Sequence, residues 1–332
     1  MKVFDLHSDL FTDIAYRRKN GETNVFDRIH YPKLKCGYVD SVICVFWVEP
    51  VFRNNPLARF EELYRYVMED LHESLHVNVC VSTEDMVDSN ETKKINVFLG
   101  LEGLSFMERW GKSDFHENIE SAFPELHAKD FRHAIYAWNE TNFLASGTGS
   151  YNEGIHKGLT EHGKEVTRLA NAKNWIVDAS HTDDKSFWDL YHTSDQPIIA
   201  SHSNARALCP QNRNLTNEQI KAIANGGGII GLNAYFEFID ERNPTVDRFI
   251  DHAVYIAELV GSEYVAFGFD FVDFLDNHEV GASFEGTTVG LETVEQVPEL
   301  LVKMEKRGFS KKELTGISYD NAFNFLSRQL KG

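Results

Sequence analysis

The 332 residues predict a protein of the α/β class, a closed (β/α)8 barrel of the TIM type. Strand-like and helix-like segments alternate from end to end, which is typical of a parallel sheet. Eight strand-like segments favour a closed barrel over an open sheet. No Pro-rich linker or run of charge divides the chain, so we expect a single domain over residues 1–332.

The expected strands are short apolar runs rich in β-branched and aromatic residues. They are Val3–His7, Val39–Val48, Ile95–Leu101, His133–Trp138, Trp175–Ala179, Pro197–Ser201, Ile229–Ala234 and Tyr264–Phe269. The expected helices place apolar residues at helical spacing. They are Leu57–His76, Asn118–Lys129, Gly163–Lys173, Lys185–His192, Asn217–Asn225, Val246–Val260, Leu291–Arg307 and Lys312–Gln329.

Helix ends and loops support this assignment. Thr216 with Gln219, and Ser310 with Glu313, have the spacing of a capping box. Three glycines from Gly226 onward follow one expected helix, as is usual at a C-terminus. We expect long loops at Ser146–Glu161 and Phe274–Thr288, on the side of a barrel where active sites are built.

Composition excludes several classes of protein. The chain has 33 basic and 51 acidic side chains, so its formal net charge is −18, which disfavours nucleic acid and anionic membranes as partners. No apolar stretch approaches the roughly 18 residues of a transmembrane helix. The four cysteines lack any framework spacing and we expect mostly buried thiols. The first residues do not resemble a signal peptide, so we expect a cytoplasmic protein.

Candidate metal ligands follow four of the expected strands. They are His7, Asp9, Glu102, His181 and His202. Side chains two apart on a strand share a face, so His7 and Asp9 can grip the same cation. Any one of the 14 histidines is more often a surface or core residue than a ligand. The coincidence of these five at strand ends is the stronger signal, and three imidazoles with two carboxylates suit a pair of Zn²⁺ ions.

Two further acids lie at strand ends. Asp5 shares the face of His7, deeper in the barrel, where it either supports the ligands or is a paired buried carboxylate. Asp270 ends the last expected strand. It faces the mouth of the barrel as a general base and acid, or it is a solvated loop residue.

The residues just described resemble the membrane dipeptidase (renal dipeptidase) family of the amidohydrolase superfamily. The similarity covers nearly the whole chain. It lies in DLHSDL around His7, GLEG around Glu102, DASH ending at His181, ASHSNARALC around His202 followed by RNLT, and GFDF around Asp270. HxD in place of HxH favours this branch over deaminases and dihydroorotase-like enzymes.

The resemblance implies a role for each residue. His7 and Asp9 would bind one zinc ion, His181 and His202 the other, and Glu102 would bridge both, while Asp270 would transfer the proton. Arg213 matches the family arginine that holds the C-terminal carboxylate of the substrate. A guanidinium suits that task, although a loop salt bridge is the alternative. The resemblance also implies a homodimer.

The sequence departs from the family at two places. Some members carry an oxyanion-binding histidine after the fourth strand, where this chain has Trp138 followed by Asn139. We expect both to face the substrate, with the indole N–H as a partial substitute or the ring as a wall. The family's DFDG becomes Asp270-Phe271-Val272-Asp273, so the second acid moves by one place and the glycine is lost.

We therefore expect a binuclear zinc dipeptidase that cleaves short peptides with a free C-terminus by attack of metal-activated hydroxide. By resemblance it accepts L,L-dipeptides and also L,D-dipeptides. Another amidohydrolase-type enzyme, such as an N-acyl-amino-acid hydrolase or a lactonase, is the alternative. A non-catalytic barrel that only binds is a further one.

Overall fold

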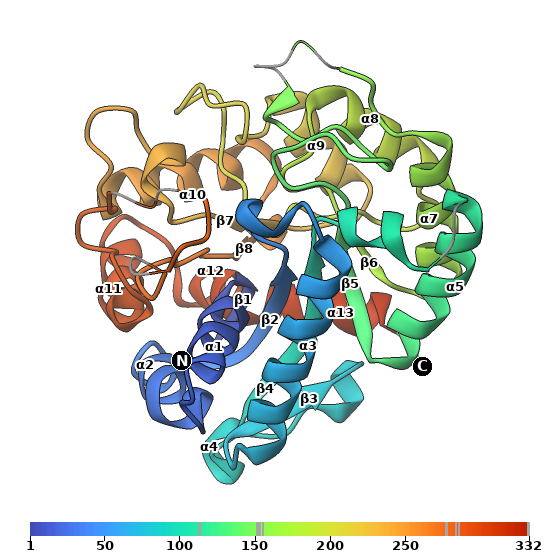
Figure 1. Ribbon diagram of the computed structural model, residues 1–332. Helices are drawn as coiled ribbons and strands as arrows, with labels where there is room; N and C mark the ends of the chain where they lie inside the picture. Colours follow the sequence, from blue (N-terminus) through green and yellow to red (C-terminus); the bar gives the residue numbers. More distant parts are fainter. Residues whose placement is uncertain are drawn as a thin grey trace.

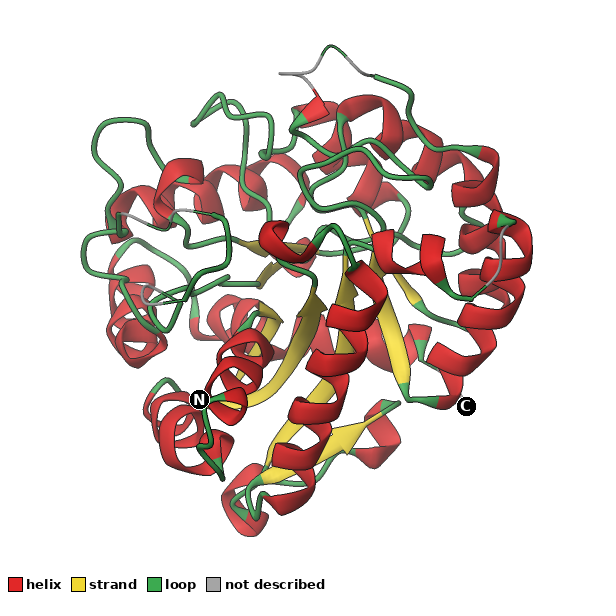
Figure 2. Ribbon diagram, in the orientation of Figure 1, coloured by secondary structure: helices red, strands yellow, loops and turns green. Residues whose placement is uncertain are grey.

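Parallel strands form the centre of the molecule and helices surround them (Figure 1, Figure 2). The computed structural model describes residues 1–111, 114–150, 154, 156–275, 278–282, 284 and 286–330. Within these residues the named strands belong to a single sheet. They are β1 (Val3–Ser8), β2 (Val39–Trp47), β3 (Val77–Cys80), β4 (Ile95–Glu102), β5 (Phe131–Ile135), β6 (Ile176–Asp178), β7 (Ile230–Leu232) and β8 (Val265–Phe267).

The sheet closes into the predicted barrel. Its order is β6-β5-β4-β2-β1-β8-β7, and every pairing in it is parallel. Ile199 and Ala200 bridge the gap, because Ile199 pairs with Asp178 of β6 and Ala200 with Ile230 of β7. This two-residue segment takes the position of the eighth barrel strand, where the sequence predicts the strand Pro197–Ser201.

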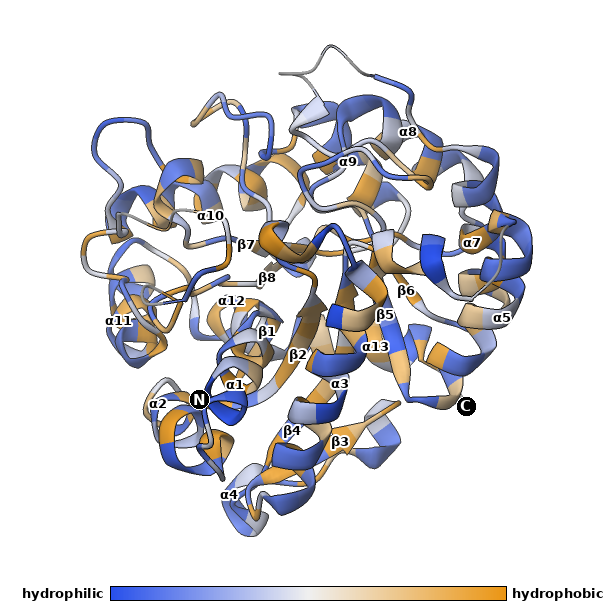
Figure 3. Ribbon diagram, viewed as in Figure 1, coloured by the Kyte–Doolittle hydropathy of each residue, from blue (hydrophilic) through white to orange (hydrophobic). Residues whose placement is uncertain are grey.

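The helices cover the outside of the barrel. They are α1 (Leu10–Lys19), α2 (Tyr31–Cys36), α3 (Pro56–Glu73), α4 (Ser89–Thr92), α5 (Phe115–Ala128), α7 (Glu161–Ala172), α8 (Asp184–Thr193), α9 (Asn217–Asn225), α10 (Val246–Val260), α11 (Val297–Lys306), α12 (Lys311–Thr315) and α13 (Asn321–Gln329). Their apolar faces turn toward the strands and their polar faces outward, as the bands along α3 illustrate (Figure 3).

Two apolar clusters form the core. The larger one fills the space between the strands and the surrounding helices. The smaller one lies inside the barrel, where Phe4, Ile43 and Phe98 meet Phe325 and Leu326 of α13. The last helix therefore packs on the barrel interior from the end where the strands begin, which leaves the carboxyl ends of the strands for the site.

Several predicted elements are confirmed closely. The bounds of α9 and α10 match those predicted, both capping boxes are present, and Gly226 ends α9. All four cysteines are free, and Cys36 is the exposed one. In the described part of the chain, none of the helices has the length and apolar character needed to cross a membrane.

Other predictions were wrong in detail. The sequence analysis missed α1 because Leu10–Ala15 is buried without a break, so the helix has no polar stripe to reveal its period. It also missed β3, a four-residue strand that pairs with the first half of β4 while β5 pairs with the second half. The strand predicted to reach Trp138 ends at Ile135, so Trp138 lies in the following loop. Parts of both predicted long loops lie outside the described residues.

Further boundaries are corrected at the C-terminal end. The helix predicted from Leu291 begins at Val297, after a short 3-10 turn. The helix predicted over Lys312–Gln329 is divided into α12 and α13 by a wider turn at Gly316–Asp320.

Candidate metal centre

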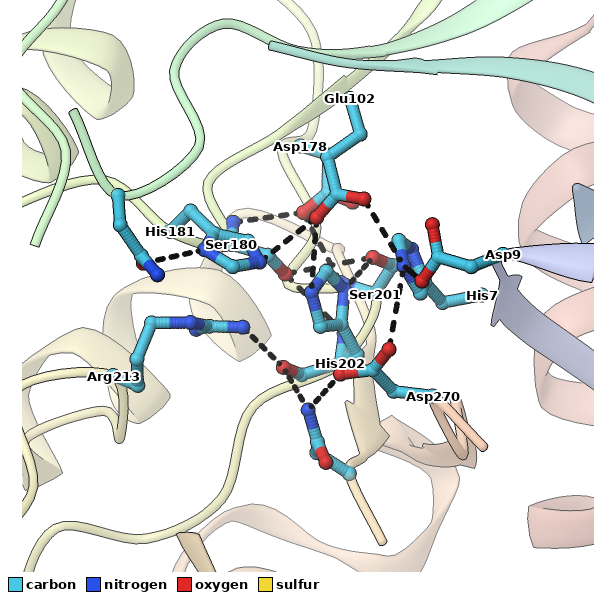
Figure 4. Close-up of polar contacts among 12 residues, drawn as sticks. His7, Asp9, Glu102, Asp178, Ser180, His181, Ser201, His202, Arg213 and Asp270 are labelled. Atoms are coloured by element: carbon cyan, nitrogen blue, oxygen red, sulfur yellow. Dashed lines mark hydrogen bonds and ion pairs between the residues drawn. The ribbon is translucent and has the colours of Figure 1, made fainter. Parts of the chain in front are cut away.

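The predicted ligands lie at the carboxyl ends of neighbouring strands. His7 is in β1, and Asp9 is the residue that precedes α1. Glu102 ends β4, His181 follows β6, and His202 follows the bridging segment at Ala200. In Figure 4 the side chains of His7, Glu102 and His202 point toward one another, with Asp9 beside them. All five are at least nine-tenths buried.

Distances show how close these groups come. The His7 Nε2 atom lies 3.5 Å from an oxygen of Asp9 and 3.5 Å from an oxygen of Glu102. The other Glu102 oxygen lies 3.7 Å from His202 Nε2 and 2.8 Å from His181 Nε2. The rings of His7 and His202 stack with their centroids 3.7 Å apart. The structure thus brings His7, His181 and His202 around the carboxylate of Glu102, and Asp9 lies beside His7.

The arrangement fits divalent cations. Donor atoms bound about 2.1 Å from one tetrahedral zinc ion are separated by roughly 3.4 Å. Most separations in the cluster, 3.5 to 3.7 Å, are of that size and exceed a hydrogen bond. Four buried atoms have no hydrogen-bond partner among the described residues: His7 Nδ1, His7 Nε2, Asp9 Oδ1 and His202 Nε2. Unpartnered buried polar atoms are costly, so donors left in this state are suited to bind an ion.

Titration behaviour points the same way. Burial, followed by repulsion from charged neighbours that include His7 and Arg213, holds the pKa values of His181 and His202 well below the usual value for histidine. Their imidazoles are therefore neutral, the form that binds metal. Burial raises the pKa of Glu102 to about 7, against attraction from His7. Burial would lower the pKa of His7, but the nearby carboxylates of Glu102 and Asp9 outweigh burial and raise that pKa well above its usual value, so the two carboxylates favour a positive charge at this position.

A hydrogen bond to Asn139 orients the His181 ring through the nitrogen that faces away from Glu102. Its Nδ1 atom donates to Asn139 Oδ1 at 2.9 Å, and Thr148 Oγ1 donates to the same oxygen at 3.0 Å. With the proton on Nδ1, Nε2 is left with a lone pair that can bind a metal ion. The backbone of His181 has φ of 67°, a left-handed conformation that is uncommon outside glycine. Asn139, predicted to bind substrate, is thus in contact with a predicted ligand.

Asp270 faces the same cluster. Its carboxylate lies 3.8 Å from His7 Nε2, and Asn233 Nδ2 donates to it at 2.9 Å. Burial, opposed by His7 and reinforced by Asp9 and Glu102, raises the pKa of Asp270 to about 8. Its φ of 58° is again left-handed. Such strain at two functional candidates is typical of sites that the surrounding structure holds in place.

Arg213 lies beside the cluster, behind His202. Its guanidinium donates to the His202 carbonyl oxygen at 3.2 Å and to Ser203 Oγ at 3.4 Å, and it rests 5.1 Å from the centroid of the Phe238 ring. Its Nε atom is buried without a hydrogen-bond partner. No carboxylate of the described residues lies within ion-pair distance of Arg213, so these residues do not provide the loop salt bridge that was the alternative role for Arg213. Its side chain does not line the cavity described next.

A cavity of about 200 Å³ opens over the candidate centre. Asp9, Glu102, His181 and Asp270 form part of its lining. Trp138 and Asn139, the two residues expected to face a substrate, line it too, and their role in binding stays a prediction. The Trp138 ring lies 5.8 Å from that of His181 and 5.2 Å from that of Trp47. The Trp138 ring also contacts Arg53, whose guanidinium lies 5.2 Å from the ring centroid and forms an ion pair with Glu140 at 2.8 Å.

Two buried aspartates fix the strand ends that carry these groups. Asp5 Oδ1 accepts from the backbone N–H of His7 at 3.3 Å and of Phe269 at 2.9 Å, which ties β1 to β8. Asp178 Oδ1 accepts from the N–H of Ser180 and Ser201, the residues before His181 and His202. Asp5 therefore supports the backbone of the ligands.

The sequence analysis missed Asp178 and its partner. His133 Nε2 is 2.8 Å from Asp178 Oδ2, and both side chains are fully buried. Asp178 stands in the DASH segment, but His133 and Ser201 come from other parts of the barrel wall, so spacing along the chain gives no signal for these two contacts. Ser201 shares a hydrogen bond with His202 Nδ1 at 2.8 Å. Because Ser201 is next to a predicted ligand in the sequence, this contact could have been predicted.

The fold and the donor set together define a (β/α)8 protein with a candidate centre for divalent cations. Comparison with known proteins gives the family: residues 1–330 match the model of the membrane dipeptidase family, peptidase family M19, and the chain belongs to it. The resemblance predicted from the motifs is therefore confirmed.

Relatives and solved structures agree with this assignment. The chain is 32% identical over 211 residues to an uncharacterized protein of the pqqA 5′ region of Klebsiella pneumoniae, over 60% of this chain and 73% of that one. It is 27% identical over 320 residues to dipeptidase tcpJ of Claviceps purpurea, over 96% of this chain but only 65% of that one. The crystal structure of a metallopeptidase from Rhodobacter sphaeroides, liganded with a phosphinate mimic of the dipeptide L-Ala-D-Ala, superposes with a TM-score of 0.80 at 20% identity and covers 99% of both chains, which shows a common fold.

Proposed function

We propose that this chain is a zinc-dependent dipeptidase with two metal ions, built on one barrel domain over residues 1–332. The observation that carries the proposal is the convergence of His7, Asp9, Glu102 and His202, because buried donor atoms of the two histidines and of Asp9 have no hydrogen-bond partner in the described part of the chain. His7 and Asp9 would hold one ion, His181 and His202 the other, and Glu102 both. The family assignment and the dipeptidases among the relatives support this.

The zinc ions, when bound, would lower the pKa of water and so supply a hydroxide nucleophile at neutral pH. The side chains of the protein do the rest. Asp270 stands close to His7 and is held by Asn233, where it can accept a proton from the nucleophile and pass it to the leaving amine. Asn139 fixes the ring of His181 in one tautomer.

Arg213 would bind the C-terminal carboxylate of the substrate. Its guanidinium has an unpartnered Nε and lies beside the cavity on the ring of Phe238. A fork of N–H groups matches a carboxylate, which restricts the enzyme to peptides with a free C-terminus. L,L-dipeptides fit this proposal, and the L-Ala-D-Ala mimic bound by the Rhodobacter sphaeroides structure supports L,D-dipeptides as well.

A hydrolysis screen tests the proposed function. The purified chain, reconstituted with zinc, is expected to cleave L,L- and L,D-dipeptides and to lose this activity in the presence of a chelator. N-acyl-amino acids and lactones belong in the same panel. Cleavage of these with no cleavage of any dipeptide would replace the proposal by the acyl-hydrolase or lactonase alternative.

The carboxylate clamp has its own test. Arg213→Ala is expected to raise KM for a dipeptide by roughly 30-fold or more, because a buried charged hydrogen bond is lost. The same dipeptide amidated at its C-terminus already lacks that contact, so its KM should change far less. Equal effects on both substrates would remove Arg213 from the carboxylate site.

A further inference from the structure

One carboxylate in the cavity has no place in the proposed centre. The cavity over the centre is lined by Asp9, Glu102, Glu237 and Asp270. Asp9 and Glu102 are candidate ligands and Asp270 is the candidate proton carrier. Glu237 has no role in the proposed centre, although the residue is exposed and lines the cavity in which a substrate would lie.

The position of Glu237 relates it to one end of the substrate. It lies in the short 3-10 turn η5 (Phe236–Phe238), which follows β7. The next residue, Phe238, carries the guanidinium of Arg213 on its ring. If Arg213 holds the terminal carboxylate, then Glu237 stands beside the C-terminal residue of a bound dipeptide and not beside its first residue.

The charge of Glu237 is not neutralised by the protein. Among the described residues, no Lys, Arg or His nitrogen lies within ion-pair distance of its carboxylate, and no Lys or Arg lines the cavity. Burial, followed by the charges of Glu237 and Asp270, raises the pKa of Tyr235, another residue of the lining. The negative charge of Glu237 therefore acts on the interior of this cavity.

The remaining walls also suit a cation. Aromatic rings dominate them, in the form of Trp47, Trp138, Tyr235, Phe238 and Phe284. Aromatic faces attract ammonium and guanidinium groups as well as apolar chains. A long basic side chain can place its methylene groups on such rings and its charge near a carboxylate at the rim.

We propose that Glu237 makes this enzyme selective for dipeptides whose C-terminal residue has a basic side chain. This inference rests on the proposed dipeptidase function and narrows its substrate class. Glu237 acts as a specificity-determining residue, through an ion pair with the lysine or arginine side chain of the substrate.

Matched substrates test the selectivity directly. The measurement is the ratio of kcat/KM for Ala-Lys to that for Ala-norleucine, which lacks only the ammonium group. A partly exposed ion pair contributes about 1 kcal/mol, so the wild-type ratio is expected to be about 5 and to fall as salt rises. In Glu237→Gln the ratio should approach 1, and Glu237→Lys should favour Ala-Glu instead. Glu241→Gln, an exposed neighbour outside the cavity lining, is the control that should retain the wild-type ratio.

The possible results distinguish a failure of the proposed selectivity from a failure of the proposed dipeptidase function. A ratio near 1 in the wild type, or one that Glu237→Gln leaves unchanged, overturns the selectivity but leaves a dipeptidase. An equal loss for both substrates in Glu237→Gln also overturns it, because it would assign Glu237 to the α-ammonium group that all dipeptides share. A preference for Lys-Ala over norleucine-Ala would move the basic side chain to the first residue and contradict the proposal. If the wild type cleaves no dipeptide at all, the proposed function falls and this inference with it.

Discussion

Two buried clusters of histidine and carboxylate lie within one turn of each other at the start of α1, and they are built differently. In the candidate centre, His7 Nε2 is 3.5 Å or more from each of its neighbouring carboxylates. In the second cluster, Asp13 receives hydrogen bonds from His278 at 2.7 Å and from Arg17 at 2.8 Å, and His30 Nε2 lies 2.9 Å from it. We call the candidate centre around His7 the open cluster, because the carboxylates around His7 Nε2 lie further from it than a typical hydrogen bond. We call the group around Asp13 the closed cluster, because its polar atoms are within hydrogen-bond distance.

The difference lies in where the positive charge comes from. Arg17 supplies it to Asp13 from within the same helix, one turn along. Burial would raise the pKa of Asp13, but the hydrogen bonds from His278 and His30 and the charge of Arg17 outweigh it and hold the pKa well below its usual range. No arginine or lysine reaches Asp9 or Glu102 among the ion pairs of the described residues. Similar residue types thus give a structural tie in one place and a candidate ion site in the other.

The largest effect is expected from breaking the open cluster at Glu102, which faces three histidines. Glu102→Gln should lower kcat/KM by roughly 1,000-fold, because charge that stabilises the reacting centre is lost. Metal content should fall as well. Glu91→Gln, at an exposed position, is the control. Full activity and metal content in Glu102→Gln would remove Glu102 from the centre.

Breaking the closed cluster should cost stability and leave the metal in place. Asp13→Asn removes one partner of a buried charged network, which costs about 3 kcal/mol in the free energy of unfolding at neutral pH. Denaturant unfolding measures that loss. Zinc content should stay at the wild-type value, and its loss would show that the two clusters are not independent.

The difference in the free energy of unfolding between wild type and Asp13→Asn is expected to depend on pH. The pKa of Asp13 is lower in the folded state than in the unfolded chain, so its stabilising effect is complete above the unfolded value of about 3.9. It is lost as pH falls through the folded value. The gap in stability between wild type and Asp13→Asn should therefore narrow as the solution is acidified below about pH 4. A gap that widens in acid would contradict the assignment.

The smallest effect is expected from loosening one ligand in the open cluster. Asn139→Ala removes the acceptor that orients His181, and supporting contacts of this kind typically change metal affinity by about 10- to 100-fold. Thr148→Val, which removes only the second donor to Asn139, should change it less. The measurement is the zinc dissociation constant by competition with a chelator. An unchanged constant together with a raised KM would return Asn139 to a role in substrate binding alone.

Features that depend on residues close together in the sequence were predictable, and contacts between residues far apart in the sequence were not. Helices α9 and α10 were predictable because spacing and caps are local, and the five candidate ligands because each lies at or just past the end of an apolar strand. The partners that hold them were not. Asp178 works through residues from neighbouring parts of the barrel wall, and the contact between Asp13 and His278 joins positions 265 residues apart. Such contacts depend on closure of the barrel and leave no pattern along the chain.

The central claim is that the open cluster is completed by metal ions. Its most direct test is the zinc content of the wild-type chain after treatment with a chelator, reconstitution with excess zinc and removal of the unbound metal. The proposed function predicts about two zinc ions per chain, retained by Asp13→Asn and reduced in Glu102→Gln. A wild-type chain that retains no zinc after reconstitution would contradict the account.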